Sequence, residues 1–191
     1  MALKQTIEVL NDMERAGVIS RYAIAGAVAA IYYVEVSSTD DLDVLVSFDT
    51  KTGGGSGLIL LSPIIEYLAV RGYDQFRHEG IVVEGWPVQF LPVAGPLDQE
   101  ALSQAVDIEL LMPQDTAGIE TRVMRPEHIV AKAISLQRPT DMLRISQFLD
   151  QRKVNLQQLA TVLQGHGLQA RWARYCQMTG RQDPLRDMMT S

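Results

Sequence analysis

The sequence has little of what marks secreted, membrane or nucleic-acid-coating proteins. Its 191 residues include a single cysteine, Cys176, which excludes an internal disulfide. No apolar run approaches the ~20 residues of a membrane helix, and the polar, amphipathic residues 1–5 are unlike a signal peptide. The net charge of −6 argues against general DNA binding, which depends on many Lys and Arg contacts to phosphates. We therefore expect a cytoplasmic protein with no membrane partner and no general affinity for DNA.

Several common catalytic patterns are also missing. The three histidines, His78, His128 and His166, have no spacing that suggests a zinc site. The glycine-rich residues 51–57 lack the Gly-Lys-Ser/Thr ending of a phosphate-binding loop. Leu58 stands where a nucleophile elbow would have its second glycine, so no hydrolase site is indicated. We interpret residues 51–57 as a linker, with a mobile lid over a site as the alternative.

The apolar residues that are present predict a mixed α/β core. They make up 47% of the chain, enough for one substantial hydrophobic core. Apolar spacing and turn residues indicate helices over residues 3–16, 26–33 and 58–71, and strands over 22–25, 42–48, 74–78, 81–84 and 87–91. The predicted fold class is α/β (α+β), with a small mixed β-sheet core and flanking helices.

Beyond residue 96 the pattern becomes mainly helical. We predict a core over residues 1–96 and a mainly helical C-terminal region over 97–191, packed on that core as one compact unit. Helices are expected at 97–106, 126–135, 140–151, 155–164 and 168–178, with one or two short strands in 107–124 and a fraying polar tail at 181–191.

A pair of carboxylates opens one of the predicted strands. Asp41 and Asp43 are two residues apart, so on a strand both side chains point to the same face. Two carboxylates at that spacing suit one or two divalent metal ions, and we expect Mg²⁺ or Mn²⁺. The plainer alternative is that the polar residues before the strand form an ordinary turn or cap.

A glycine turn precedes this pair at a probable junction between strand and helix. Small residues around Gly26 would let a phosphate approach the backbone N–H groups at the N-terminus of the helix. The alternative is that they only allow the helix to pack tightly on the sheet. The order of strand, glycine turn, short helix, polar loop and Asp-x-Asp strand favours a site that holds a triphosphate against a metal ion.

These motifs resemble the nucleotidyltransferase superfamily, whose signature is a Gly-Gly or Gly-Ser turn followed by an Asp-x-Asp strand. Ala25 stands at the first turn position and Gly26 keeps the second. More narrowly, the chain is similar to minimal nucleotidyltransferase-like proteins grouped with the AbiEii-type toxin family, whose Thr-x-Asp-x-Asp start is matched by Thr39, Asp41 and Asp43. The resemblance spans residues 7–149 and includes segments 85–92 and 125–144.

The resemblance implies a metal-dependent protein that binds an NTP. It would transfer a nucleotidyl group to a hydroxyl of a protein, a tRNA or a small molecule, and its setting would be a toxin with an antitoxin partner, or phage defence. Asp41 and Asp43 would be the catalytic and metal-binding residues. The nucleotide and its phosphates would be bound by Ala25, Gly26, Ser38, Thr39, Lys132 and Arg138.

Three positions depart from the superfamily pattern. Many members have an arginine where this chain has Ser37, and the first turn glycine is Ala25. A third carboxylate on a later strand has its apparent counterpart in Gln89, whose amide binds Mg²⁺ less tightly and cannot act as a general base. Glu84 is the nearest acidic substitute, but strand alternation places it on the opposite face unless a bulge intervenes at Gly85 or Pro87.

These departures keep two other hypotheses open. The chain would retain the fold as a non-catalytic nucleotide-binding or protein-interaction module, or it would be a small α/β protein whose Asp-x-Asp only begins a strand. The roles of residues in the helical half are also left open, since Lys132 could be a solvated surface lysine as well as a phosphate contact. Arg138 matches a recurring family segment, whereas Asp141 and Arg144, three apart, suit a surface ion pair or a structural brace.

Overall fold

The computed structural model describes residues 2–35, 39–48, 57–111 and 117–189. The chain divides into two compact units, one made of Met1–Val28 with Ser38–Met124 and the other of Ala29–Ser37 with Arg125–Ser191. None of the helices in the described ranges combines the length and apolar character that crossing a bilayer requires.

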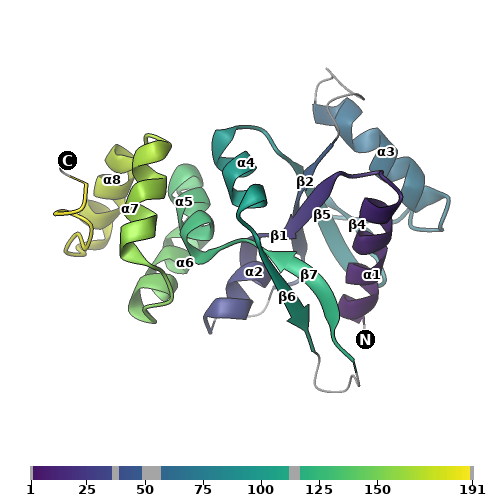
Figure 1. Cartoon of the computed structure of the whole chain (residues 1–191), viewed down its shortest axis with the longest axis horizontal. Coiled ribbons are helices and arrows are strands. Elements are labelled where there is room, and N and C mark those ends of the chain that lie inside the picture. Colours follow the sequence, from purple (N-terminus) through teal and green to yellow (C-terminus); the bar gives the residue numbers. More distant parts are fainter. Residues whose placement is uncertain (1, 36–38, 49–56, 112–116, 190–191) are drawn as a thin grey trace. The chain divides into compact units, whose positions relative to one another are not determined.

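The first unit is built on a mixed sheet, which confirms the predicted fold class (Figure 1). Seven strands of the described residues pair in the order β3-β4-β5-β2-β1-β7-β6. The β2–β5 and β1–β7 pairs are parallel and the others antiparallel. The strands are β1 (Arg21–Ile24), β2 (Leu42–Ser47), β3 (Phe76–Arg77), β4 (Gly80–Val83), β5 (Trp86–Pro92), β6 (Val106–Leu110) and β7 (Ile119–Val123).

Helices cover this sheet and bury its apolar residues. The helices are α1 (Ala2–Arg15), α3 (Gly57–Ala69) and α4 (Pro96–Ser103), while α2 (Gly26–Tyr33) runs from the first unit into the second. Ile7, Leu10 and Met13 of α1 recur at helical spacing and are fully buried. Removing such side chains from water stabilises the unit by about 1.5–3 kcal/mol each.

The sheet extends past residue 96, where the sequence suggested that the core would end. Strand β7 lies beside β1, with Ile24 opposite Val123, and the Met124 N–H donates to the Ile24 carbonyl at 3.0 Å. The first unit therefore continues through Met124, and β6 and β7 belong with the sheet rather than with the helical region. Pairing between segments a hundred residues apart leaves no local signal in the sequence.

A polar network ties α1 to the sheet. The hydroxyl of Tyr22 on β1 donates to Asn11 Oδ1 at 2.6 Å and lies 3.0 Å from Thr121 Oγ1. Arg122 donates to the Tyr22 carbonyl at 3.0 Å and pairs with Glu14 of α1 at 2.8 Å. Burial raises the pKa of Tyr22 to about 12. Because its polar groups are hydrogen-bonded, this network holds the unit together.

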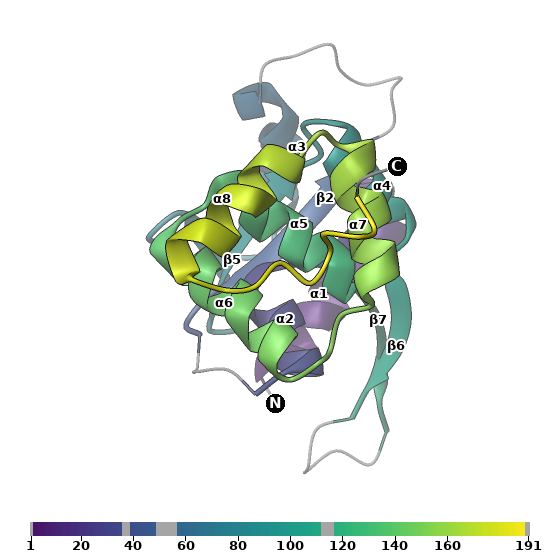
Figure 2. The same cartoon turned by 90° about the vertical axis from the view of Figure 1, so that its left-hand side faces the viewer.

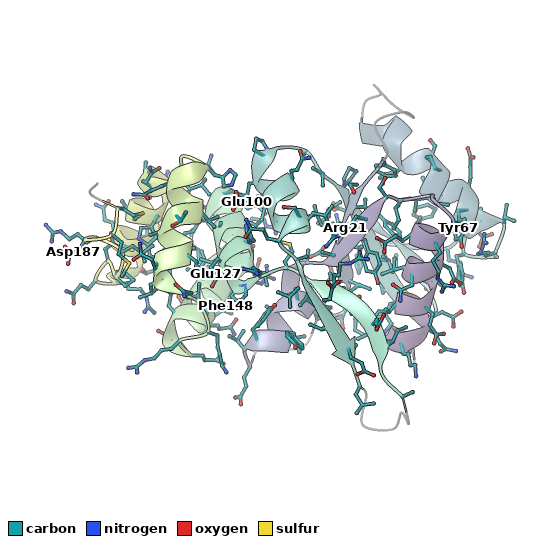
Figure 3. The ribbon with its side chains drawn as sticks, in the orientation of Figure 1. Arg21, Tyr67, Glu100, Glu127, Phe148 and Asp187 are labelled. Atoms are coloured by element: carbon teal, nitrogen blue, oxygen red, sulfur yellow. The ribbon has the colours of Figure 1, made fainter. Side chains whose placement is uncertain are left out.

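The second unit is helical, as predicted, and Figure 2 shows its helices grouped around α5. They are α5 (Pro126–Leu136), α6 (Pro139–Asp150), α7 (Leu156–Gly165) and α8 (Gln169–Thr179). Trp172 and Phe148 are fully buried in this unit. The buried carboxylate of Glu127 accepts a hydrogen bond from the Asn155 N–H at 2.8 Å, just before α7 begins (Figure 3).

The polar tail beyond α8 packs against the helices up to residue 189, so the prediction that it frays was wrong for residues 181–189. Leu185 is fully buried, and Trp172 Nε1 donates to Asp183 Oδ1 at 2.7 Å. One apolar side chain and one aspartate therefore anchor a segment whose overall composition is polar.

Candidate functional site

The turn between β1 and α2 requires glycine. Gly26 has a φ of +58°, a left-handed conformation that a residue with a Cβ adopts only at a cost. A Cβ built on Gly26 would lie 1.9 Å from Asp43 Oδ2, far inside van der Waals contact. The buried Ala25 also holds this turn beside Asp43, since its N–H donates to the Asp43 carbonyl at 2.9 Å. The carboxylate of Asp43 therefore lies directly against the glycine turn.

The predicted carboxylate pair lies at the start of β2. Asp43 is the second residue of the strand and half-buried, whereas Asp41 comes immediately before the strand and is exposed. The Thr39 hydroxyl donates to Asp41 Oδ1 at 2.7 Å, which holds that carboxylate in place. The first unit thus brings Ala25, Gly26, Thr39, Asp41 and Asp43 to one end of β2. Ser37 and Ser38 lie outside the described residues.

Strand β5 places Gln89 directly beside this pair. It runs parallel to β2, and Gln89 is the register partner of Asp43. Side chains of partnered residues project from the same face of a sheet, so the amide and the carboxylate are neighbours. Gln89 Nε2 donates to Glu79 Oε2 at 2.7 Å. The residue next to Asp43 therefore carries an amide, and that amide is hydrogen-bonded to the carboxylate of Glu79.

Glu84 does not substitute for that third carboxylate, and the suggestion that a bulge realigns it with Gln89 was wrong. Strands β4 and β5 pair without a bulge from Ile81–Val88 to Val83–Trp86. Glu84 and Gly85 form the tight turn between them, with φ values of +50° and +88°.

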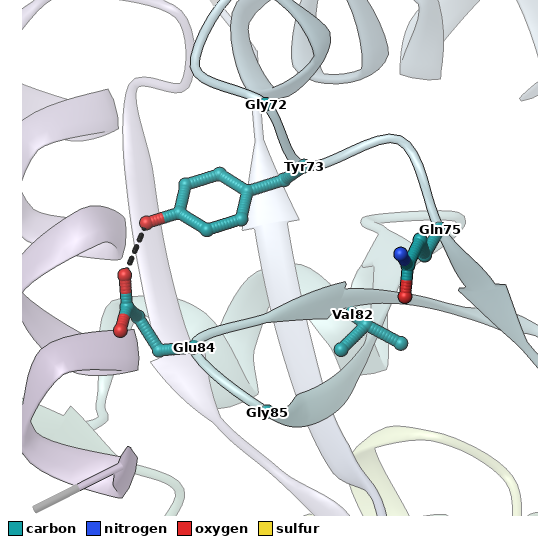
Figure 4. Close-up of a pocket in the computed structure, with 6 residues that line it drawn as sticks. All are labelled: Gly72, Tyr73, Gln75, Val82, Glu84 and Gly85. Carbon is teal, nitrogen blue, oxygen red and sulfur yellow. Dashed lines mark hydrogen bonds between the residues drawn. The ribbon is translucent and has the colours of Figure 1, made fainter.

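The Glu84 carboxylate is instead engaged in a separate pocket (Figure 4). Its Oε1 accepts a hydrogen bond from the Tyr73 hydroxyl at 2.5 Å, and this bond is the main reason that the pKa of Tyr73 rises to about 12. The pocket has a volume of about 370 Å³ and is lined by Gly72, Tyr73, Gln75, Val82, Glu84 and Gly85.

The two basic residues of the resemblance belong to the second unit. Arg138 precedes α6, and its side chain donates to Asp141 Oδ2 at 2.8 Å. Its backbone N–H also donates to Asp141 Oδ2, at 3.1 Å, and Arg144 lies 3.5 Å from Oδ1. Because Asp141 is only 1% exposed, the surface ion-pair interpretation was wrong, and these contacts brace the start of α6. Lys132 is half-buried on α5.

The donor set at β2 suits magnesium only when a ligand completes it. Within the described ranges, no group of three or more His, Cys, Asp or Glu side chains is arranged to hold a metal ion. Asp41 and Asp43 supply two hard oxygen ligands. Mg²⁺ is commonly bound by one or two carboxylates together with substrate phosphates and water. The residues present therefore fit a Mg²⁺ ion that shares its coordination with phosphates.

Sequence reasoning missed Glu79. Continuing the pairing of Ile81 with Val88 by one residue sets Gly80, not Glu79, opposite Gln89, and Glu79 lies in the turn between β3 and β4. The strand register alone therefore gives no signal for the contact between Glu79 and Gln89.

The glycine turn, α2 and the carboxylate strand β2 lie within a nucleotidyltransferase-like fold. The fold is similar to that in the crystal structure of an antigenic nucleotidyltransferase-like protein from Paracoccidioides brasiliensis. It matches with a TM-score of 0.55 over 98% of this chain and 92% of that chain, at 16% sequence identity. At this identity the likeness shows the fold. No protein-family model matches the chain, and a search of the curated proteins gave no match.

Proposed function

We propose that this chain is a metal-dependent nucleotidyltransferase-like protein that binds an NTP at the start of β2. The observation that carries the proposal is the contact between the Gly26 turn and the Asp43 carboxylate, where a Cβ would come within 1.9 Å of Oδ2. A phosphate group at the N-terminus of α2 would thereby lie next to a metal-binding carboxylate. The nucleotidyltransferase-like fold supports the same reading.

Each site residue has a distinct task in this proposal. The Gly26 turn lets the Asp43 carboxylate approach the start of α2. The N-terminal N–H groups of α2 would bind a phosphate there, because the helix dipole favours negative charge. Asp41 and Asp43 would hold the Mg²⁺ or Mn²⁺, and the Thr39 hydroxyl, 2.7 Å from Asp41 Oδ1, orients the first of them. The metal, when bound, neutralises charge on the phosphates. Roles for Lys132 and Arg138 at the phosphates, and for Ser38, stay predictions.

The reaction would be nucleotidyl transfer to a hydroxyl. The acceptor oxygen forms a bond to the α-phosphorus, the bond from that phosphorus to the bridging oxygen breaks, and pyrophosphate leaves while the hydroxyl loses its proton to water. Positioning and charge neutralisation supply most of the acceleration in such transfers. The acceptor class, whether protein, tRNA or small molecule, the AbiEii-type toxin setting with an antitoxin partner, and a cytoplasmic location all remain predictions from the sequence.

A specific observation favours a second function. Gln89 is the register partner of Asp43, and an amide there cannot take the proton of an attacking hydroxyl. A non-catalytic nucleotide-binding or protein-interaction module would retain Gly26 and Asp43 while lacking a general base. Binding of a metal–NTP complex without turnover identifies this alternative.

The test is to incubate the protein with each α-labelled NTP, Mg²⁺, and protein, tRNA or small-molecule acceptors in turn. The proposal predicts label on an acceptor and release of pyrophosphate, both abolished in Asp41→Asn/Asp43→Asn. Nucleotide binding without label transfer would leave the non-catalytic nucleotide-binding alternative. No nucleotide binding at all would contradict the proposal and leave the protein-interaction module.

A further inference from the structure

The described side chains next to Asp43 offer a neutral ligand where a third carboxylate would be expected. Gln89 lies opposite Asp43 in the parallel β2–β5 pair and is half-buried. Its amide carries one acceptor and one donor group, and only the carbonyl oxygen can contact a cation. Which of the two faces the site depends on what the other one binds.

Glu79 decides this orientation. Its Oε2 lies 2.7 Å from Gln89 Nε2, and an ionised carboxylate only accepts hydrogen bonds, so the donor end of the amide is held at Glu79. Turning the amide over would set two oxygens against each other. The carbonyl oxygen Oε1 of Gln89 is therefore left to accept from, or coordinate, a ligand beside Asp43.

We propose that Glu79 is a positioning residue that presents the Gln89 carbonyl oxygen to a Mg²⁺ ion held by Asp41 and Asp43, and that this site binds the metal more tightly as a metal–nucleotide complex than alone. The inference rests on the proposed function and names the form in which its ligand binds.

The charge of the metal ligands supports the proposal that the metal binds together with a nucleotide. Two carboxylates and one amide oxygen contribute a charge of −2, one less than a set with three carboxylates. Mg²⁺ gives up its water reluctantly, and a site with few charged ligands gains the missing coordination from phosphates. The absence of any three-residue His, Cys, Asp or Glu group among the described residues agrees with this.

The experiment is titration calorimetry with two probes, Mg²⁺ alone and Mg²⁺ with an α,β-methylene NTP that cannot transfer its nucleotidyl group. For the wild type we expect binding of the metal–nucleotide complex, and binding of Mg²⁺ alone that is weaker by about tenfold or more. Gln89→Asp restores a third carboxylate and should strengthen the binding of Mg²⁺ alone by about tenfold.

The positioning role of Glu79 is tested in the same assay. Glu79→Ala should weaken binding of the metal–nucleotide complex by about tenfold, the scale seen when partners of metal ligands are removed. Glu66→Ala, which removes the same charge from an exposed position on α3, should leave binding unchanged. In a Gln89→Leu background Glu79→Ala should have little further effect, because the residue acts through the amide.

The outcomes separate the inference from the function on which it rests. Wild-type affinity in Glu79→Ala, or binding of Mg²⁺ alone to the wild type as tight as to Gln89→Asp, would overturn the inference while the nucleotide site stands. Absence of metal–nucleotide binding in both the wild type and Gln89→Asp would overturn the proposed function and the inference together.

Discussion

Two aspartates of this chain, Asp43 and Asp141, lie near the start of a secondary-structure element, and their surroundings differ. Asp141 is 1% exposed near the start of α6 and accepts hydrogen bonds from the backbone and side chain of Arg138. Asp43 is half-buried on β2, against a glycine that leaves space for its carboxylate.

The difference between the two aspartates separates a motif that stabilises the fold from one that is available to a ligand. The Arg138–Asp141 spacing looked like part of a nucleotide site, yet its contacts fix the N-terminus of a helix within the second unit. The Asp41–Asp43 pair forms no comparable helix cap, and exposed Asp41 is held only through Thr39 among the contacts described above. Loss of Asp141 should therefore cost stability, and loss of Asp41 should cost binding.

The largest effect on stability is expected for Asp141→Ala. The substitution removes a buried acceptor from the first turn of α6 and leaves the Arg138 N–H and side chain without it. We expect the free energy of unfolding to fall by about 2–3 kcal/mol, less than for a fully buried pair because Arg138 is 62% exposed. Urea denaturation measures this, and a loss below about 0.5 kcal/mol would show that the brace is not structural.

The next largest effect is expected for Gly26→Ala, which tests the contact between the glycine turn and Asp43. The new Cβ would lie 1.9 Å from Asp43 Oδ2, and the alanine would have to adopt a positive φ. We therefore expect the free energy of unfolding to fall by about 2 kcal/mol or more and NTP binding to weaken. Gly17→Ala is the matched control, because Gly17 has a φ of +70° but nothing within 4 Å of its Cβ position. Equal losses in the two variants would mean that the contact with Asp43 is unimportant.

A smaller effect, dependent on pH, is expected from Tyr22. Its pKa is raised to about 12 by burial, above the ordinary 10, so the folded state holds the proton more tightly than the unfolded state. This contribution to stability is complete below pH 10 and is lost as the pH rises toward 12. Stability measured from pH 9 to 12 should fall less steeply in Tyr22→Phe than in the wild type. An unchanged slope would assign the loss to other groups.

The smallest effect on stability is expected for Asp41→Asn. The side chain is exposed and asparagine still accepts from the Thr39 hydroxyl, so the free energy of unfolding should change by no more than about 0.5 kcal/mol. Metal-dependent nucleotide binding should nevertheless be lost. Thermal unfolding and calorimetry on the same preparation give both values. A large loss of stability would place Asp41 with the structural aspartates.

Local features of the fold were predictable from the sequence because local chemistry decides them. Helix α2 begins and ends where the pattern placed it, at Gly26 and Tyr33. The turn between β4 and β5 lies at Glu84–Gly85, one residue before the position that the sequence indicated. The resemblance singled out Gln89, which the structure places opposite Asp43.

Long-range features were not predictable in the same way. The attachment of β7 to β1 depends on pairing across about a hundred residues, and the packing of the C-terminal tail depends on Leu185 and on Asp183 meeting Trp172. The Glu79–Gln89 hydrogen bond joins the side chain of a residue in the β3–β4 turn to β5, which strand alternation does not predict.

The central claim is that the start of β2 is a metal-dependent nucleotide site, and titration calorimetry tests it most directly. Wild type and Asp41→Asn/Asp43→Asn are titrated with each of the four NTPs in the presence of Mg²⁺ and again with EDTA. The account predicts binding of at least one NTP to the wild type that disappears in the double variant and in EDTA. Equal NTP binding by both proteins, or binding by neither, would contradict it.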